Sequence, residues 1–391
     1  MKTVLIYYKG FNAIPGGSEF QPLMLISELQ KHCRVTLALG WKSNIEQACK
    51  VYGVPVDTTK LDVVYTRPKN KILLRLDTIL PFYRTRMLRR LAKNADICIS
   101  AMNIMDFGKP AHSFICSLTD LGDVGFKDFV LHTHKKATTH LIRFVRRFIG
   151  EVILRPLLRM RSTRTILSDM REHIYTNSFY TERTMKEYFG NFNSTVFYPP
   201  TILEISKPFS TNRDRLRVNY IGRISESKDI IGIIRIVEQT RRLTNLDITL
   251  HLAGYIERTS YVETVKKVIA DKHWCTLVGP VTGEAQEKFL LSGSYAIHTE
   301  RDEAFGISIT EYLKASIIPI VPDEGGACEI ADAPDLTYHN HEEAAQILAK
   351  LIGDEAFYKR QLTHCISRAQ YFSIGEYMKR QDKLINDLLN Q

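Results

Sequence analysis

The sequence predicts an α/β protein built from two successive doubly wound, Rossmann-like domains. Short apolar runs alternate with amphipathic stretches along the chain, a rhythm typical of βαβ units and parallel sheets. The length of 391 residues also exceeds what one hydrophobic core usually organises. The alternation pauses at Tyr198-Pro199-Pro200 and in the polar stretch 210–214 before it restarts, which predicts a linker between two domains.

The first domain is expected at 1–200, the linker at 201–213 and the second domain at 214–371. In the first domain, strands are expected at 4–8, 35–39, 95–100, 113–117, 129–132 and 165–167, and helices at 19–31, 135–163 and 180–189. In the second, strands are expected at 216–221, 247–253, 276–278, 295–298 and 317–321, and helices at 230–242, 260–271, 284–291 and 306–315. Two such domains would face a central cleft, and ligands of these folds bind at the carboxyl ends of the strands.

Composition narrows the class of protein. Hydrophobic content of 44% and charged content of 25% are ordinary for a soluble globular chain. The seven cysteines are dispersed without a Cys-x-x-Cys pair, which predicts reduced thiols, a cytoplasmic protein and no zinc site. No apolar run approaches the roughly 18–20 residues of a membrane-spanning helix, and the amino terminus does not resemble a secretory signal.

The net charge of +10 is concentrated in the first half of the chain. Basic residues gather in two regions, 84–93 and 135–171, where they alternate with large apolar residues. This pattern suits helices on an anionic membrane surface, at about 1 kcal/mol per basic residue near the lipid. The alternative is an ordinary solvated helix face. Nucleic acid is not expected, because no nucleic-acid-binding motif accompanies the charge.

Cations follow the first expected strand of the second domain. Gly222 and Arg223 come directly after that strand, and Lys228 lies five residues beyond Arg223. A glycine at a strand end lets the backbone approach a ligand, and two cations in one loop can neutralise a diphosphate. We therefore expect a phosphate site here.

Two carboxylates, Glu303 and Glu311, stand eight positions apart with Phe305-Gly306 between them. The glycine predicts a loop at Glu303 and a helix that begins before Glu311. Carboxylates accept hydrogen bonds from sugar or ribose hydroxyls, and the helix dipole favours an anion near a helix start. Further on, Gly325-Gly326 follows a strand, where backbone N–H groups can face an anion or a sugar hydroxyl.

The order of these motifs resembles the C-terminal domain of retaining GT-B glycosyltransferases of family 4. Gly-Arg-x4-Lys, Ala-Gly, Leu-x-Gly-x-Val, Glu-x7-Glu with an internal Phe-Gly, and Gly-Gly-x-x-Glu occur in that order within 220–330. The segment Pro15-Gly16-Gly17-Ser18-Glu19 is similar to the family's first glycine loop. The resemblance implies a GT-B fold in which the first domain binds the acceptor, the second binds the donor, and a C-terminal helix at 372–391 packs back onto the first domain.

The resemblance also implies roles for these residues. Arg223 and Lys228 would hold the donor diphosphate and stabilise the departing nucleoside diphosphate. Glu311 would bind the ribose, and Glu303 would lie beside the donor sugar. The other expected donor contacts are Gly16, Gly17, Gly222, Phe305, Gly306, Gly325 and Gly326. One of His132 and His134 would lie near the donor sugar, although a histidine at a strand end can equally be structural.

The implied reaction is transfer of a hexose, with retention, from a nucleotide diphosphate sugar to a lipid-linked or cell-surface glycan. Such an enzyme of lipopolysaccharide or polysaccharide biosynthesis would be peripheral on the inner face of the membrane. The segment 196–200 is similar to lipid-linked oligosaccharide mannosyltransferases and favours GDP-mannose, with UDP-linked sugars as the alternative. Paired carboxylates also suggest hydrolysis, but in this family the leaving phosphate deprotonates the acceptor. No cofactor and no metal are expected, because no Asp-x-Asp motif stands out.

Three other functions remain to be weighed. A GT-B epimerase would turn over the nucleotide sugar without an acceptor, and a non-catalytic carbohydrate- or membrane-binding GT-B module would not turn it over. A dinucleotide-dependent oxidoreductase would need a Gly-x-Gly-x-x-Gly fingerprint that the first loop lacks. The chain also departs from the family at His298-Thr299, where Pro-Ser is usual, and Glu300-Arg301-Asp302 adds unusual charge beside the expected site.

Overall fold

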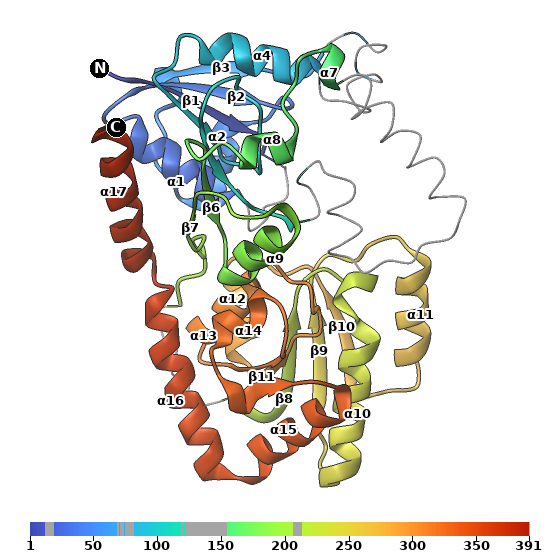
Figure 1. Cartoon of the computed structure of the whole chain (residues 1–391). Helices are drawn as coiled ribbons and strands as arrows, with labels where there is room; N and C mark the ends of the chain where they lie inside the picture. The colour runs from blue at the N-terminus through green and yellow to red at the C-terminus, as the bar shows by residue number, and fades with distance from the viewer. Residues whose placement is uncertain are drawn as a thin grey trace. The chain divides into compact units, whose positions relative to one another are not determined.

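The computed structural model describes residues 1–11, 19–68, 70, 74, 82–118, 121, 155–205 and 213–390. Contacts divide the chain into two compact units, Met1–Pro200 with Tyr377–Gln391 and Thr201–Glu376. Each unit is a parallel sheet with helices packed on it (Figure 1). The predicted fold class, two doubly wound α/β domains, is confirmed.

The first unit contains a seven-stranded sheet in the order β3-β2-β1-β4-β5-β6-β7, with every pair parallel. The strands are β1 Thr3–Tyr8, β2 Arg34–Leu39, β3 Leu61–Tyr65, β4 Ile97–Ser100, β5 His112–Phe114, β6 His173–Thr176 and β7 Ser194–Val196. The helices are α1 Phe20–Leu29, α2 Ile45–Tyr52, α4 Phe82–Ala92, α7 Arg155–Leu157, α8 Thr163–Leu167 and α9 Phe179–Phe189, with a short 3-10 turn η1 Thr58–Lys60. Strands that are covered on both faces consist of nearly continuous apolar residues. For this reason the sequence predicted β1 and β2.

The carboxyl-terminal helix α17, Ile374–Asn390, belongs to the first unit from Tyr377 onward. The Tyr377 ring packs edge-on against Phe197 at 5.7 Å. The Gln381 side chain donates to the Met24 carbonyl at 3.3 Å, and Lys2 Nζ donates to the Leu389 carbonyl at 2.7 Å. From Tyr377 onward these contacts fix the helix to Phe197, to α1 and to the amino terminus.

The second unit contains a six-stranded sheet in the order β10-β9-β8-β11-β12-β13. The strands are β8 Asp214–Ile221, β9 Thr249–Ala253, β10 Cys275–Gly279, β11 Gly293–Ile297, β12 Ile318–Pro322 and β13 Thr337–Tyr338. The helices are α10 Ile230–Thr244, α11 Ser260–Ile269, α12 Glu284–Leu291, α13 Ile307–Lys314, α14 Gly326–Ala331, α15 His341–Gly353 and α16 Glu355–Tyr371, with 3-10 turns η4 Glu226–Lys228 and η5 Pro334–Leu336. The strand order reverses between β8 and β11, and ligands of doubly wound sheets bind at that switch point.

One predicted strand was wrong. Residues 165–167 form the end of α8, because the Ser162 side chain caps that helix by accepting a hydrogen bond from the Thr165 N–H at 3.1 Å. The strand in this region is β6, which begins at His173. The predicted strand 129–132 and most of the predicted helix 135–163 lie outside the described residues.

The first part of the predicted linker is fixed to α13. Lys314, whose side chain is only 7% exposed, donates from Nζ to the Thr201 and Leu203 carbonyls at 3.1 Å and to Glu204 at 3.0 Å. The Thr201 and Thr310 hydroxyls lie 2.6 Å apart. A buried ammonium is stable only when its donors are satisfied, and here the linker satisfies it.

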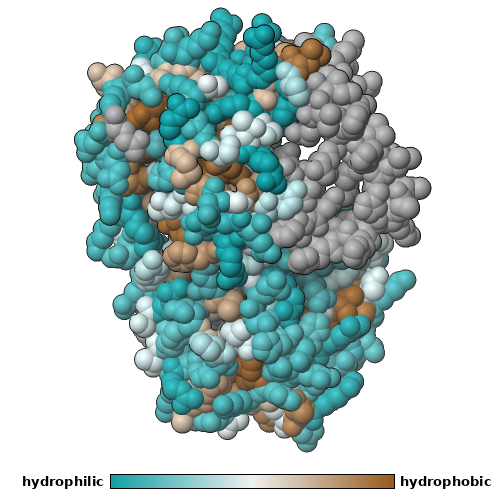
Figure 2. All heavy atoms as spheres, in the orientation of Figure 1, coloured by the Kyte–Doolittle hydropathy of each residue, from teal (hydrophilic) through white to brown (hydrophobic). Residues whose placement is uncertain are grey.

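The surface in view is mostly hydrophilic over both units, with scattered hydrophobic side chains (Figure 2). Among the described residues, no helix has the length and apolarity needed to span a bilayer.

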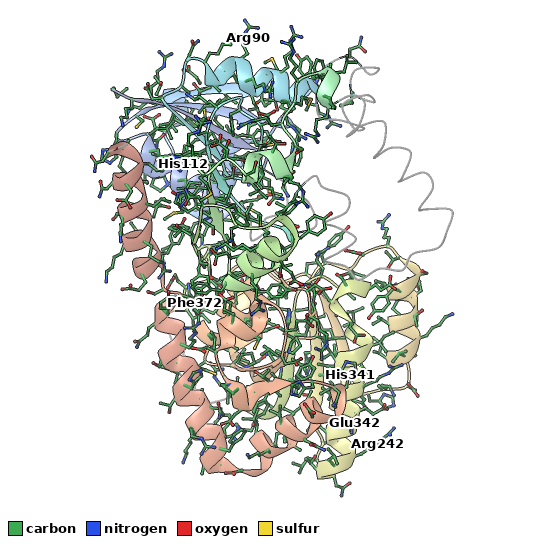
Figure 3. The ribbon with its side chains drawn as sticks, viewed as in Figure 1. Arg90, His112, Arg242, His341, Glu342 and Phe372 are labelled. Carbon is green, nitrogen blue, oxygen red and sulfur yellow. The ribbon has the colours of Figure 1, made fainter. Side chains whose placement is uncertain are left out.

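The basic residues around α4 form two sets. Arg84 donates to the Tyr7 hydroxyl at 3.1 Å, and Arg89 pairs with the buried Asp106 at 2.6 Å, so both stabilise the fold. A second set, the α4 basic face, consists of Arg86, Arg90 and Lys93, all exposed and spaced to share one face (Figure 3 labels Arg90). The side chains of the α4 basic face are therefore accessible from solvent.

We predict that Gly254→Ala destabilises the second unit by more than about 2 kcal/mol. Gly254 has φ +141°, and a Cβ there would overlap the Gly222 carbonyl oxygen. Gly353→Ala is the matched control, because a Cβ at this helical position meets nothing within 4 Å. Urea denaturation should show a large loss in free energy of unfolding for the first variant and no loss for the second. Equal stability of the two variants would contradict the packing described.

Candidate active site

One cationic loop and one acidic loop meet at the carboxyl ends of β8 and β11. Lys228 ends the 3-10 turn η4 that follows β8, and its ammonium contacts the carboxylates of both Glu300 and Glu303, which follow β11. The Lys228 side chain is 14% exposed and each carboxylate is 20% exposed. We call Lys228, Glu300, Glu303 and the neighbouring His298 the Lys228 cluster. It lies at the switch point of the sheet, where a ligand is expected.

The acidic loop is held on several sides. The Thr299 hydroxyl donates to the Lys228 carbonyl at 2.7 Å. Arg301 donates to Asp323 Oδ1 at 2.7 Å and to the His339 carbonyl. These contacts fix the loop on either side of Glu300, so its carboxylate is directed toward Lys228 by the surrounding structure.

Gly325 and Gly326 pack directly against this loop. Gly325 has φ +87°, and a Cβ on either glycine would overlap backbone of residues 301–305. The Gly326 N–H donates to the Glu303 carbonyl at 2.6 Å. The two glycines therefore allow close packing on the acidic loop, and the Gly326 amide is used inside the protein. Their contact with a donor stays a prediction.

Charge in the Lys228 cluster is unevenly distributed. Burial and the adjacent Glu303 raise the pKa of Glu300 to about 7. Burial opposes ionisation of Glu303 as well, but the Lys228 ammonium outweighs it and lowers the pKa of that carboxyl. Burial would also lower the pKa of Lys228, yet the two carboxylates raise it. At neutral pH the cluster therefore contains an ionised Glu303, a charged Lys228 and a partly protonated Glu300.

His298 lies beneath the two carboxylates with its side chain 2% exposed. Burial and the Lys228 charge lower its pKa to about 4, so it is neutral. Nε2 lies 3.9 Å from Glu303 Oε2 and has no hydrogen-bond partner within the part of the chain that the structure describes. Ligand atoms of His298, Glu300 and Glu303 converge within 4.8 Å. The Lys228 ammonium already bridges the carboxylates, so we do not assign these residues as metal ligands.

Glu311 lies inside α13, and Glu303 lies in the loop before it, as predicted. Gly306, with φ +94°, starts the helix. The Gln286 side chain on α12 donates to Glu311 Oε1 at 3.0 Å, and burial raises the pKa of Glu311 to about 7. The next residue, Tyr312, accepts a hydrogen bond from the Ile221 N–H at 2.7 Å, so α13 is tied to the end of β8.

Arg223 and Phe305 lie in environments that sequence motifs do not reveal. Arg223 is 60% exposed and donates to Glu257 Oε1 at 3.2 Å, so its guanidinium reaches solvent beside the site. The Phe305 ring is buried and packs edge-on against Phe372 at 6.2 Å. The Phe305 side chain therefore has a packing role, and a donor contact is left to its backbone. At position 222, a Cβ atom would lie 2.6 Å from the Tyr220 hydroxyl, so glycine avoids that overlap.

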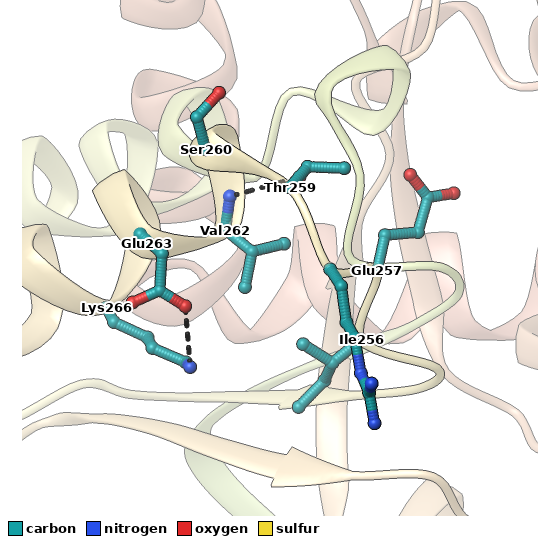
Figure 4. Close-up of a pocket in the computed structure, with 8 residues that line it drawn as sticks. Ile256, Glu257, Thr259, Ser260, Val262, Glu263 and Lys266 are labelled. Atoms are coloured by element: carbon teal, nitrogen blue, oxygen red, sulfur yellow. Dashed lines mark hydrogen bonds and ion pairs between the residues drawn. The ribbon is translucent and has the colours of Figure 1, made fainter.

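A shallow hollow of about 480 Å³ lies beside the Arg223 loop (Figure 4). It is lined by Ile256, Glu257, Arg258, Thr259, Ser260, Val262, Glu263 and Lys266. Several of its polar groups already have partners: Glu263 pairs with Lys266 at 2.9 Å, Glu257 pairs with Arg223, and the Thr259 side chain caps α11. The hollow is open and lacks the convergent charges of the Lys228 cluster, so we place the site at the cluster.

Comparisons with known proteins bear on the family and the fold. Residues 202–370 match the family model described as "Glycosyl transferases group 1". The fold is similar to that of HepE from Anabaena, solved with UDP and glucose, at 14% identity and a TM-score of 0.67 over 99% of this chain and 100% of that one. The protein is a glycosyltransferase with the GT-B fold.

Two further structures show the same fold. WaaG, described as a glycosyltransferase involved in lipopolysaccharide biosynthesis, has 11% identity and a TM-score of 0.64 over 98% of this chain and 99% of that one. Sucrose-phosphate synthase from Thermosynechococcus elongatus has 11% identity and a TM-score of 0.67 over the full length of both chains. No curated protein matches the sequence.

Several predicted residues of this glycosyltransferase lie outside the described residues. They are Gly16, Gly17, His132 and His134, together with the basic region 135–154. Their roles stay predictions.

Sequence analysis missed two residues of the site. Glu300 was noted as unusual charge and not as a partner of Lys228, because a loop has no periodicity that would reveal its direction. Gln286 lies 25 positions from Glu311, outside any motif. A signal for Glu300 existed in the extra acidic residue three positions before Glu303.

We predict that Glu311→Gln stabilises the enzyme at alkaline pH. Burial raises the Glu311 pKa to about 7, so the folded state binds this proton more tightly than the unfolded state does. The stability it contributes is complete below the unfolded pKa and is lost as pH rises through 7. Relative to wild type, the variant should gain on the order of 1 kcal/mol between pH 5 and pH 8 in urea denaturation.

Glu284→Gln is the control for this measurement, since Glu284 is 91% exposed on the same helix as Gln286. The pH-dependent gain in stability of Glu311→Gln should clearly exceed any change measured for this control. A pH-independent difference for Glu311→Gln would show that the Glu311 carboxyl is solvated.

Proposed function

We propose that the protein is a retaining glycosyltransferase of family 4 that transfers a hexose from a nucleoside diphosphate sugar to a glycan. The observation that supports this most strongly is the Lys228 ammonium, which meets Glu303 across 75 positions of sequence at the switch point of the sheet. That arrangement supplies a cation for a diphosphate and an ionised carboxylate for a sugar hydroxyl at one place. The family match over 202–370 and the UDP and glucose in the HepE structure support a nucleotide sugar as donor.

In this proposal the cations act on the leaving group. Negative charge grows on the nucleoside diphosphate as the glycosidic bond breaks, and Lys228 with Arg223 stabilises it more in the transition state than in the ground state. Glu311, held by Gln286, binds the ribose hydroxyls.

Glu303 is a poor general base, because its pKa is lowered by Lys228. The acceptor hydroxyl therefore passes its proton to the leaving phosphate on the same face of the sugar, which retains the anomeric configuration. Glu303 instead orients the donor sugar through its hydroxyls.

Two observations bear on the identity of the donor, and they favour different nucleotides. Similarity of residues 196–200 to lipid-linked oligosaccharide mannosyltransferases favours GDP-mannose. The UDP-glucose complex of HepE makes a UDP-hexose the alternative. A thermal-shift panel of GDP-, UDP- and dTDP-sugars distinguishes them, because the donor that binds the folded state raises Tm.

We predict that Lys228→Ala and Glu311→Ala each lower kcat/KM for transfer by at least about 100-fold. Each removes a group that grips the donor, while Lys266→Ala, an exposed lysine of the same unit, should have wild-type activity. The assay measures the nucleoside diphosphate that transfer releases. Thermal melting checks that each variant folds. Near wild-type activity in both site variants would refute the donor-site assignment. Donor consumption without acceptor would favour the epimerase.

We also propose that the acceptor is lipid-linked, that the enzyme works at the inner face of the membrane, and that the α4 basic face contacts anionic lipid. Three exposed cations at about 1 kcal/mol each would contribute on the order of 100-fold in vesicle binding. WaaG, with its role in lipopolysaccharide biosynthesis, is one of the similar structures.

We predict that replacing Arg86, Arg90 and Lys93 by serine weakens binding to phosphatidylserine vesicles by roughly this factor at low salt. The control replaces three exposed cations of the second unit, Arg242, Lys266 and Lys267, with serine. It therefore has the same net charge as the α4 variant. Co-sedimentation with the vesicles measures both. Equal binding of the two triple variants would assign the α4 basic face to ordinary solvation.

A further inference from the structure

The cation that the proposed function assigns to the diphosphate is already neutralised inside the protein. Lys228 Nζ contacts Glu300 and Glu303 together, so one positive charge faces two carboxylates. Glu303 has a place in the proposed reaction, beside the donor sugar. Glu300 has none. Its position is nevertheless fixed on both sides, by the Thr299 and Arg301 contacts described above.

The other titratable groups that face Glu300 do not change this balance. His298 beneath it is neutral, and the buried Tyr220 of β8 has a pKa raised well above its usual value, so it is neutral too. The Arg301 guanidinium is directed to Asp323 and the His339 carbonyl. With both carboxylates ionised, the Lys228 cluster has a net charge of −1, and the diphosphate of a nucleotide sugar adds two more negative charges. Several like charges around one ammonium in a partly buried site repel one another strongly.

We propose that Glu300 is a proton-linked gate of the donor site: the diphosphate displaces its carboxylate from Lys228, and Glu300 takes up one proton from solvent as the donor binds. The proton adds to a carboxylate oxygen, and it returns to solvent when the nucleoside diphosphate leaves and Lys228 is again available. Glu300 is thus a positioning residue that sets when Lys228 can accept phosphate. This inference rests on the proposed role of Lys228.

Glu300, and not Glu303, is the group that takes the proton. The two carboxyls have the same exposure, but Glu303 has a further polar neighbour, His298 Nε2 at 3.9 Å, and the Gly326 N–H holds its backbone carbonyl at 2.6 Å. The pKa directions agree with this difference, because that of Glu300 is raised and that of Glu303 is lowered. Loss of the Lys228 contact removes the interaction that opposes this rise, so the pKa of Glu300 increases further in the complex. Because the bound state holds one more proton than the empty state, donor affinity should fall as pH rises above about 7.

Titration calorimetry with an intact nucleotide sugar tests this. UDP-glucose and GDP-mannose are suitable probes, because their phosphates are diesters that stay ionised between pH 6 and 9, whereas the terminal phosphate of a free nucleoside diphosphate titrates near pH 6. Binding heats at pH 8 in two buffers of different ionisation enthalpy give the number of protons taken up. Since Glu311 also titrates near pH 7, the decisive quantity is the difference between wild type and Glu300→Gln.

We expect wild type to take up close to one proton more than Glu300→Gln does. At pH 8.5 the variant should bind the nucleotide sugar at least tenfold more tightly than wild type, and the two should converge near pH 6. Glu324→Gln is the matched control: it removes the same charge from a neighbouring exposed position, 3.9 Å from Arg301, and should behave as wild type does. Glu300→Met serves if the glutamine variant does not fold.

The outcomes separate this inference from the proposed function. If Lys228→Ala binds the nucleotide sugar as tightly as wild type does, the proposed donor site is wrong. If Lys228→Ala loses binding but wild type and Glu300→Gln show the same proton uptake and the same pH profile, only the gate is wrong. If Glu324→Gln matches Glu300→Gln, the effect comes from net charge and not from the contact with Lys228.

Discussion

The contact of one ammonium with two carboxylates is the interaction on which the rest of this site depends. Partly buried charges are stable only when they are paired and hydrogen-bonded. Lys228, Glu300 and Glu303 satisfy this condition for one another, and the surrounding backbone is arranged to keep them together. Gly325 and Gly326 let one loop approach another, and Arg301 anchors the acidic loop to the end of β12 through Asp323.

Sheet topology explains why residues so far apart in sequence meet. The second unit places β8 beside β11, so the turn after β8 and the loop after β11 open on the same edge of the sheet. Helix α13 then continues from the same loop and brings Glu311 into the fold, with Tyr312 tied to the end of β8. The proposed contacts to phosphate, sugar and ribose thus come from the turn after β8, the loop after β11 and helix α13 of one Rossmann-like unit.

Much of this could be predicted from sequence, and the physical reasons are specific. Buried parallel strands are continuous apolar runs, so β8 and β12 were predicted within two residues, and Gly306 marked the start of α13. A short amphipathic helix such as α8 has no such signal, and its β-branched Thr165-Ile166 followed by Leu167 was predicted to be a strand. Loop side chains were also invisible: nothing in the sequence shows that Glu300 turns toward Lys228, that Arg223 turns toward Glu257, or that the Phe305 ring enters the core.

A crystal structure of the enzyme with a nucleoside diphosphate sugar tests the central claim most directly. The account predicts a phosphate oxygen within hydrogen-bond distance of Lys228 Nζ, the ribose hydroxyls on Glu311, and the Glu300 carboxyl withdrawn from the ammonium. Phosphates bound elsewhere, with Lys228 still in contact with both Glu300 and Glu303, would contradict it.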